Sequence, residues 1–171
     1  MIVTVGNIRI GGSNPLVLIA GPCVVESRKS VLAVAERVVR IAERRRIPVI
    51  FKSSYKKANR TSVNSFSSIG MNEALEILAE VKRRFGIPVL TDIHTSEEAA
   101  HAAEVVDILQ IPAFLCRQTE LLQAAGKTGR VVNIKKGQFM APEDMRLAAE
   151  KVVLSGSKKV LLTEPGTTFG Y

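Results

Sequence analysis

Short apolar runs of strand length alternate with longer amphipathic stretches over most of the 171-residue chain. The short runs are rich in Val, Ile and Leu, which is typical of parallel strands buried on both faces. Strand and helix in regular alternation predict parallel βα units. The predicted strands cover residues 16–20, 48–52, 88–92, 107–111, 131–135 and 159–163.

The first long helix is predicted over residues 27–46. It ends in three consecutive arginines, which suit the negative end of a helix dipole. Apolar side chains recur every three or four residues, so one face of the helix is expected to be buried. The residues predicted on that face are Val31, Val34, Val38 and Ile41.

Further helices are indicated downstream. The helix predicted over residues 71–85 stops at Gly86, and its predicted buried face consists of Leu75, Leu78 and Val81. Ser96 is predicted to cap a helix with an acidic first turn, and Pro142 is predicted to open another. An Ile-Pro pair leads from helix to strand at both residue 47 and residue 87, which indicates a βα repeat.

The first twelve residues follow a different pattern. Two alternating apolar runs flank Gly6-Asn7, a hairpin signal. We therefore expect a β-hairpin over residues 1–12 and a partial barrel over residues 13–171. The predicted fold class is α/β, of the (β/α)₈ TIM-barrel type but incomplete, since about six strands are present and a whole barrel takes ~250 residues. An open barrel exposes strand edges, so we expect a C-terminally truncated piece or a barrel that something else closes.

Composition fits one globular domain, with 46% hydrophobic and 23% charged residues. No apolar run approaches the ~18 residues of a membrane span, and a secretory signal pattern is missing, so we expect a cytoplasmic protein. A disulfide between the two cysteines is not expected in that compartment. The formal net charge of +8 admits nucleic acid, a membrane surface or small anionic substrates as partners.

Polar residues gather directly after the predicted strands. In a parallel barrel the carboxyl ends of the strands share one face, where barrel enzymes build their active sites. We therefore expect a site on that face. The clusters occupy residues 21–23, 52–62, 92–94, 110–118, 135–138 and 164.

The predicted site is basic, which favours substrates that carry phosphate or carboxylate groups. Asn59 and Gln110 add directional hydrogen bonds of the kind that sugar hydroxyls require. A plainer interpretation treats residues 56–60 as an ordinary solvated loop, and charge alone does not decide between the two. The cations expected to line the site are Lys52, Lys57, Arg60, Arg117 and Lys135.

Histidine and cysteine residues give weaker signals. His94, which follows Asp92 at a strand end, fits either a functional role or a place beside a helix cap, whereas His101 is expected to be exposed. On the residues alone, Cys23 fits a small buried thiol better than a metal ligand. Cys116 is expected to pack in the core. A P-loop or Gly-x-Gly-x-x-Gly pattern is missing from the sequence, so a nucleotide cofactor is not indicated.

Seven stretches, in order along nearly the whole chain, resemble the 3-deoxy-D-manno-octulosonate 8-phosphate synthases. They read AGPCVVES from residue 20, FKSS from 51, KANRT from 57, TDIH from 91, QIPAFLCRQT from 110, NIKKGQF from 133 and GTTFGY from 166. The resemblance implies a barrel enzyme that condenses phosphoenolpyruvate with arabinose 5-phosphate to give the octulosonate 8-phosphate, a lipopolysaccharide precursor, and phosphate. It also implies a divalent metal ion as cofactor and a homo-oligomer, usually a tetramer.

The resemblance assigns roles to residues on the substrate side. Lys52, Lys57 and Lys135 match lysines around phosphoenolpyruvate. Gln110 and Ala113 match residues that line the same pocket. These five positions are therefore expected to bind the three-carbon substrate.

Other matches concern the sugar and the metal. Asn59, Arg60 and Thr61 match the segment that holds arabinose 5-phosphate, although the family more often has Ser at position 61. Arg117 matches an arginine that reaches the sugar phosphate of a neighbouring subunit. Cys23 matches the metal-ligating cysteine of the metal-dependent class, so the resemblance favours a ligand over a buried thiol there.

Lys57, Asp92 and His94 are the candidate proton donors and acceptors, without a ranking among them. Two departures from the family pattern bear on activity. Pro165 stands where the family has an arginine that contacts the phosphate of phosphoenolpyruvate, and Pro offers neither charge nor donor. The family's other metal ligands, a His, a Glu and an Asp, match nothing up to Tyr171. We therefore expect a chain that derives from an active synthase but is not active alone.

Three alternatives stay open. The related 3-deoxy-arabino-heptulosonate 7-phosphate synthases use erythrose 4-phosphate, but they commonly read Lys-Pro-Arg-Thr in the segment where this chain has Asn59, which favours the five-carbon sugar. An inactive piece that associates with intact subunits fits the unclosed barrel. Nucleic-acid binding is suggested by the net charge of +8, but a recognised nucleic-acid motif is missing from the sequence.

Overall fold

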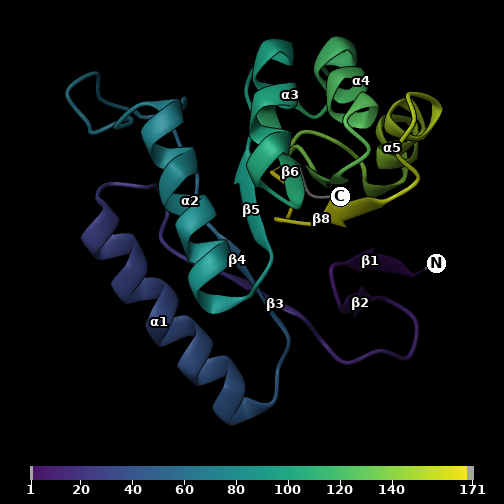
Figure 1. Ribbon diagram of the computed structural model, residues 1–171. Coiled ribbons are helices and arrows are strands. Elements are labelled where there is room, and N and C mark those ends of the chain that lie inside the picture. The colour runs from purple at the N-terminus through teal and green to yellow at the C-terminus, as the bar shows by residue number, and fades with distance from the viewer. Residues whose placement is uncertain (1, 169–171) are drawn as a thin grey trace. The chain divides into compact units, whose positions relative to one another are not determined.

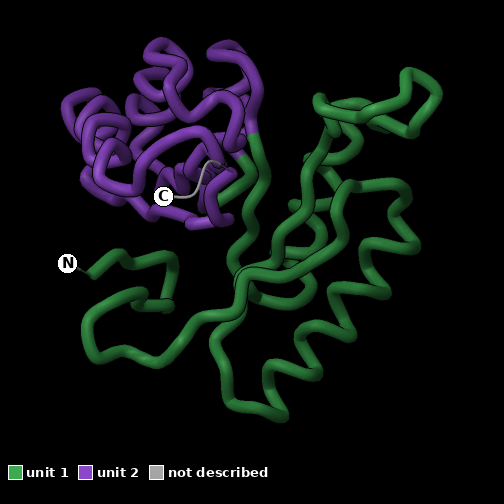
Figure 2. Tube along the Cα trace, turned by 180° about the vertical axis from the view of Figure 1, so that it is seen from behind, with its two compact units in different colours: residues 1–92, 105–107 green, residues 93–104, 108–171 purple. Residues whose placement is uncertain are grey.

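The computed structural model describes residues 2–168. The chain divides into two compact units, residues 1–92 with 105–107 and residues 93–104 with 108–171 (Figure 2). Each unit combines parallel strands with helices. Among the described residues, none of the helices is long and apolar enough to cross a membrane.

The first unit begins with the expected antiparallel hairpin (Figure 1). Strands β1 (Val3–Val5) and β2 (Ile8–Ile10) pair with Val5 opposite Ile8. Gly6 turns the chain between them with a φ of +57°, a conformation that glycine adopts without strain. The hairpin prediction is confirmed, while the domain boundary at residue 12 stays a prediction.

Three parallel strands follow the hairpin in the first unit. Strands β3 (Leu18–Ala20), β4 (Val49–Lys52) and β5 (Val89–Asp92) pair in chain order. All three begin later than predicted. For β4 and β5 the physical reason is proline, which has no N–H to give to a strand ladder. Pro48 and Pro88 still take part, because their carbonyl oxygens accept the N–H groups of Leu18 and Phe51 at 2.9 Å.

Two helices belong to the first unit, and the first corrects one prediction. Helix α1 (Arg28–Arg45) begins after Ser27, whose hydroxyl accepts the N–H of Ser30. Ile41 is 48% exposed, so it does not lie on the buried face as predicted. Val34 and Val38 are partly buried, and Ala42 is 2% exposed, so the buried face is shifted round the helix axis. The buried residues of α1 are Val31, Leu32, Ala35 and Ala42.

Helix α2 (Met71–Phe85) confirms its prediction, with a buried face that includes Leu75, Leu78 and Val81. Gly86 ends it in the left-handed conformation at a φ of +64°. A tether from residues 105–107 completes the unit. The carboxylate of Asp107 accepts from Lys82 Nζ at 2.8 Å and from the N–H of Val89 at 3.0 Å.

The second unit contains three more parallel strands, which also pair in chain order. They are β6 (Ile108–Ile111), β7 (Val131–Lys135) and β8 (Val160–Thr163). Helices α3 (Ser96–Val105), α4 (Thr119–Lys127) and α5 (Met145–Leu154) alternate with them, and α4 packs on α5. Short 3₁₀ turns cover Ala113–Leu115 and Pro142–Asp144, so Pro142 opens the last helical segment as predicted.

The predicted cap of α3 is displaced by one position. Ser96 is the first residue of the helix and does not precede it. Glu98 Oε2 accepts the backbone N–H groups of His94 at 2.6 Å and Thr95 at 3.2 Å, so the carboxylate reaches back over the helix start. The Thr95 hydroxyl is also the main cause that lowers the pKa of the Glu97 carboxyl.

Parallel strands and helices alternate through both units, after an antiparallel hairpin. The strands are built from buried aliphatic residues, as the apolar runs predict. This arrangement confirms the expected fold class, an α/β chain with the elements of an incomplete (β/α)₈ barrel.

Candidate anion-binding site

The most distinctive polar cluster of the first unit lies at the carboxyl end of β4. Lys52, the last residue of the strand, donates from Nζ to Ser54 Oγ at 3.0 Å. Lys57 Nζ donates to the same hydroxyl oxygen at 2.8 Å. Ser54 is fully buried, and its carbonyl oxygen accepts the N–H of Val25 at 2.9 Å. A rigid serine therefore brings two ammonium groups together.

This convergence has an electrostatic consequence. Like charges repel, and the repulsion strengthens where the surroundings are only partly hydrated, as they are for Lys52 and Lys57. One neutral hydroxyl offers lone pairs to both groups but no negative charge. Within the described chain, Lys57 forms no ion pair with a carboxylate. A carboxylate or phosphate from outside the chain would neutralise the charge of Lys57, so the cluster is suited to binding an anion.

The loop after this cluster is exposed. Asn59, Arg60 and Thr61 lie at the surface, and Arg60 Nε donates to the carbonyl of Phe66 at 3.1 Å. These three residues are as exposed as a solvated loop would be, whereas Lys57 is partly buried and does not fit that interpretation. Their contact with a sugar stays a prediction.

Asp92 and Cys23 lie near the carboxyl ends of two strands, β5 and β3, that flank β4. Asp92 ends β5 and is 5% exposed. Cys23, which follows β3, is exposed, so its interpretation as a small buried thiol is wrong. Its role as a metal ligand stays a prediction. Residues 2–168 contain no group of three or more His, Cys, Asp or Glu side chains that could hold a metal ion.

In the second unit, a hydrogen-bonded chain of side chains crosses the three strands. Asn133 on β7 donates from Nδ2 to Gln110 Oε1 on β6 at 3.1 Å. Thr163 on β8 donates from its hydroxyl to Asn133 Oδ1 at 2.9 Å. Asn133 is 3% exposed, so its amide is committed to these neighbours. These hydrogen bonds hold the side chain of Gln110, a predicted site residue. The other two residues, Asn133 and Thr163, are not among the predicted site residues.

The other candidates of this unit differ in exposure. Lys135 ends β7 and is partly buried, and Ala113 begins the 3₁₀ turn after β6. Arg117 is exposed and lines a groove of about 560 Å³ beside α5. The imidazole of His94 is 9% exposed and lies 3.6 Å from Glu98 Oε2, which fits the interpretation of a residue beside a helix cap. His101 is exposed, as predicted.

Three other residues after the strands make contacts that can be seen only in the structure. Ser54 gathers two lysines, as described above, and Lys136 is buried among carbonyl oxygens. Cys116 is fully buried with its Sγ 3.3 Å from Met140 Sδ, which confirms core packing. Lys136 directly follows the last residue of β7, and its burial separates it from the partly buried Lys135.

The fold and the site together indicate a βα-barrel protein that binds small anions. The chain carries βα-barrel elements with basic and amide side chains at the carboxyl ends of the strands, suited to binding small anions. The family model described as the DAHP synthetase I family matches residues 1–171. The chain therefore belongs to the DAHP synthetase I family.

Curated relatives agree over nearly the whole chain. A protein of Trichlorobacter lovleyi, named 2-dehydro-3-deoxyphosphooctonate aldolase, is 58% identical over 168 residues, which are 98% of this chain and 62% of the relative. Proteins of the same name from Geobacter metallireducens and Granulibacter bethesdensis are 57% and 58% identical over 99% of this chain, and over 62% and 60% of their own lengths. The chain thus spans about 62% of the length of the first of these relatives.

Proposed function

We propose that this chain forms the phosphoenolpyruvate-binding part of an enzyme that condenses phosphoenolpyruvate with arabinose 5-phosphate. The products are 3-deoxy-D-manno-octulosonate 8-phosphate and inorganic phosphate. The observation that carries the proposal is the convergence of Lys52 and Lys57 on one hydroxyl, which suits an anionic substrate. The name shared by the relatives at 57–58% identity supports the eight-carbon product over the seven-carbon alternative.

The proposed reaction balances without an oxidant or reductant. C3 of phosphoenolpyruvate attacks the aldehyde carbon of the open-chain sugar and forms the new carbon–carbon bond, while water adds at C2. The C2–O bond to phosphate then breaks, and phosphate leaves. The resemblance implies that Lys52, Lys57 and Lys135 bind phosphoenolpyruvate, and their positive charge would compensate the charge that grows on the departing phosphate. The proton that water releases passes through Asp92 or His94 to the oxygen of the former aldehyde, while Lys57, as an ammonium group, can only donate.

Binding of the sugar is assigned to the exposed loop and to one arginine. Asn59, Arg60 and Thr61 contact arabinose 5-phosphate, and Arg117 reaches the sugar phosphate bound to a neighbouring subunit. The exposed guanidinium of Arg117 supports that assignment, because it is available to a second copy of the protein. The proposal therefore includes a homo-oligomer, a tetramer as in the family, that acts in the cytoplasm on the route to lipopolysaccharide.

A divalent metal ion belongs to the proposal for the whole enzyme, with Cys23 as one ligand. The exposed thiol after β3 supports access of an ion to this position. A stable site needs three or four ligands. The described residues do not fit the ion on their own, since they offer no further group of ligands near the thiol. The steps above are accordingly derived from the cationic side chains alone.

Titration of phosphoenolpyruvate into the 171-residue protein, followed by calorimetry, tests the proposal. Lys57→Met is expected to weaken binding by about tenfold or more, because a charge-assisted hydrogen bond contributes roughly 1.5–3 kcal/mol. Lys56→Met is the matched control, since it removes the same charge from the adjacent residue, and it should bind within about twofold of wild type. Equal weakening by both variants, or no binding by the wild-type protein, would contradict the proposal.

Turnover identifies the second substrate. Phosphate release by an active form of the enzyme is measured with arabinose 5-phosphate and with erythrose 4-phosphate, and mass spectrometry identifies the product. Release with the five-carbon sugar alone supports the proposal, whereas preference for erythrose 4-phosphate contradicts it.

A further inference from the structure

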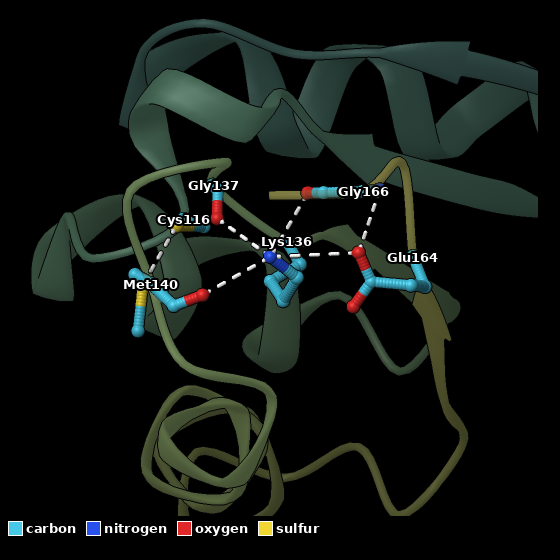
Figure 3. A network of polar contacts seen from close by, with 6 residues as sticks. All are labelled: Cys116, Lys136, Gly137, Met140, Glu164 and Gly166. Carbon is cyan, nitrogen blue, oxygen red and sulfur yellow. Dashed lines mark hydrogen bonds and ion pairs between the residues drawn. The ribbon is translucent and has the colours of Figure 1, made fainter. Parts of the chain in front are cut away.

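Lys136 places a positive charge in the interior of the second unit. Its side chain is 2% exposed, although it directly follows the end of β7. Nζ donates to the carbonyl oxygens of Gly137 at 3.0 Å, Met140 at 3.1 Å and Gly166 at 3.1 Å (Figure 3). The carboxylate of Glu164 lies 3.4 Å away. An ammonium group has three N–H donors, and here carbonyl oxygens take all three.

These partners come from two separate segments. Gly137 and Met140 belong to the turn after β7, in which the N–H of Met140 also donates to the carbonyl of Gly137 at 3.0 Å. Gly166 belongs to the segment after β8, where its N–H donates to Glu164 Oε1 at 2.7 Å. Lys136 therefore links the two segments that follow adjacent, paired strands.

Burial of an ammonium group is costly unless partners compensate for the lost water. The three carbonyl dipoles and the nearby carboxylate provide that compensation. With its donors occupied by the backbone, Lys136 has no N–H left for a substrate. Its effect on a ligand must therefore be indirect.

We propose that Lys136 is a positioning residue for Lys135, the lysine that ends β7. It fixes the backbone at which Lys135 leaves β7 and holds residues 137–140 against residues 164–166. The two consecutive lysines differ in exposure, since Lys136 is buried in the internal link whereas Lys135, at the end of β7, is only partly buried. The part that concerns phosphoenolpyruvate rests on the proposed function.

Backbone contacts around Lys136 show how closely the two segments are joined. The N–H of Lys136 itself donates to the carbonyl of Thr163 at 2.9 Å, and the N–H of Thr168 donates to the carbonyl of Gln138 at 3.0 Å. A Cβ on Gly137 would lie 2.7 Å from the ring of Phe139, so the turn is tightly packed. The ammonium group sits where these contacts meet, and its loss is expected to release both segments together.

Hydrogen exchange followed by mass spectrometry tests this link in the 171-residue protein. Lys136→Met keeps a chain of similar length but removes the charge and its donors. Exchange over residues 136–141 and 164–168 should become at least about tenfold faster, while α4 and α5 keep their wild-type protection. Lys158→Met is the matched control, since it removes an exposed lysine of the same unit, and it should leave both segments unchanged.

Affinity for phosphoenolpyruvate is the second readout. Lys136→Met should bind about tenfold more weakly than wild type, and Lys158→Met within about twofold. If Lys136→Met does not fold, Lys136→Arg takes its place, because a planar guanidinium keeps the charge but does not reproduce three bonds from one nitrogen. Arg is then expected to give faster exchange in the same two segments and weaker binding.

The outcomes separate the two proposals. Unchanged exchange in both segments overturns the link, whatever the affinity. Faster exchange with unchanged affinity overturns the positioning role. If the wild-type protein does not bind phosphoenolpyruvate, the proposed function fails, while the exchange data still support or overturn the link made by Lys136.

Discussion

Arg46 ends α1 in the left-handed conformation, with φ 54° and ψ 39°. It is the one non-glycine residue with a positive φ among residues 2–168. Gly86 occupies the same position after α2, with φ 64° and ψ 25°. Both residues close their helices through the backbone N–H, which Arg46 donates to the carbonyl groups of Ala42 and Glu43. The two helix ends thus differ mainly in whether a side chain is forced into this conformation.

The size of the effect follows from this comparison. The left-handed conformation costs an ordinary residue about 1–2 kcal/mol. Glycine avoids that cost but adds about 0.5–1 kcal/mol of entropy to the unfolded chain. Arg44 and Arg45 remain in the last turn of α1, so its dipole stays compensated. Arg46→Gly is therefore expected to raise the free energy of unfolding by about 0.5–1 kcal/mol.

Gly86→Ala is the reciprocal test. A Cβ there would meet no described atom within 4 Å, so its cost is that of the backbone conformation, about 1 kcal/mol. Urea unfolding gives both values, and thermal unfolding should show shifts of about 2–4 °C per kcal/mol in a chain of this size. A less stable Arg46→Gly protein would refute the reasoning, because it would mean that the arginine side chain stabilises the native state. So would a Gly86→Ala protein as stable as wild type.

Three further changes probe the sheet, the surface and the amide chain. Gly21→Ala would place a Cβ 2.0 Å from the carbonyl oxygen of Lys52, so we expect a loss of about 3 kcal/mol or more in urea unfolding and weaker phosphoenolpyruvate binding; wild-type stability would contradict this. The side-chain hydrogen bond from Arg28 holds the pKa of the Glu80 carboxyl below 4.5, so Glu80→Gln should reduce stability at neutral pH. The difference in the free energy of unfolding between wild type and Glu80→Gln should reach its full size above pH 4.5 and decrease as the pH falls through the lowered pKa. A difference that increases in acid would exclude the ion pair as its cause. Thr163→Val leaves a buried amide oxygen on β7 without its donor, so the free energy of unfolding should fall by about 1–3 kcal/mol, and an unchanged value would argue against the hydrogen-bonded chain.

Elements whose signals are local could be predicted from the sequence. Helix α2 combines a regular apolar period with a terminal glycine, and both its ends agree with the prediction. Helix α1 shows the limit of such signals. Ile41 and Ala42 are adjacent, and the apolar spacing along the helix allows either of them to lie on the buried face. Which of them is buried depends on the surface that the helix meets. In the structure Ala42 is buried and Ile41 is exposed, although hydrophobicity alone would predict the reverse.

In the candidate site, too, contacts between residues close in sequence could be predicted, and contacts between different strands could not. Lys52, Ser54 and Lys57 lie within six residues of sequence, so a basic cluster at this strand end could be anticipated without the structure. The contact of Asn133 with Thr163 joins positions on different strands and depends on strand register. Lys136 is a further case, since a lysine after a strand is usually exposed. Its burial becomes evident only when the carbonyl oxygens around Nζ are in place.

The tether made by Asp107 has a consequence for synthesis of the protein on the ribosome. Strands of the first unit pair in chain order, so β3, β4 and β5 can associate as each one emerges. The carboxylate that holds Lys82 and the N–H of Val89 arrives later, with residue 107. A nascent chain that stops after β5 would therefore lack these bonds, and resistance to proteases should rise sharply once Asp107 has left the exit tunnel.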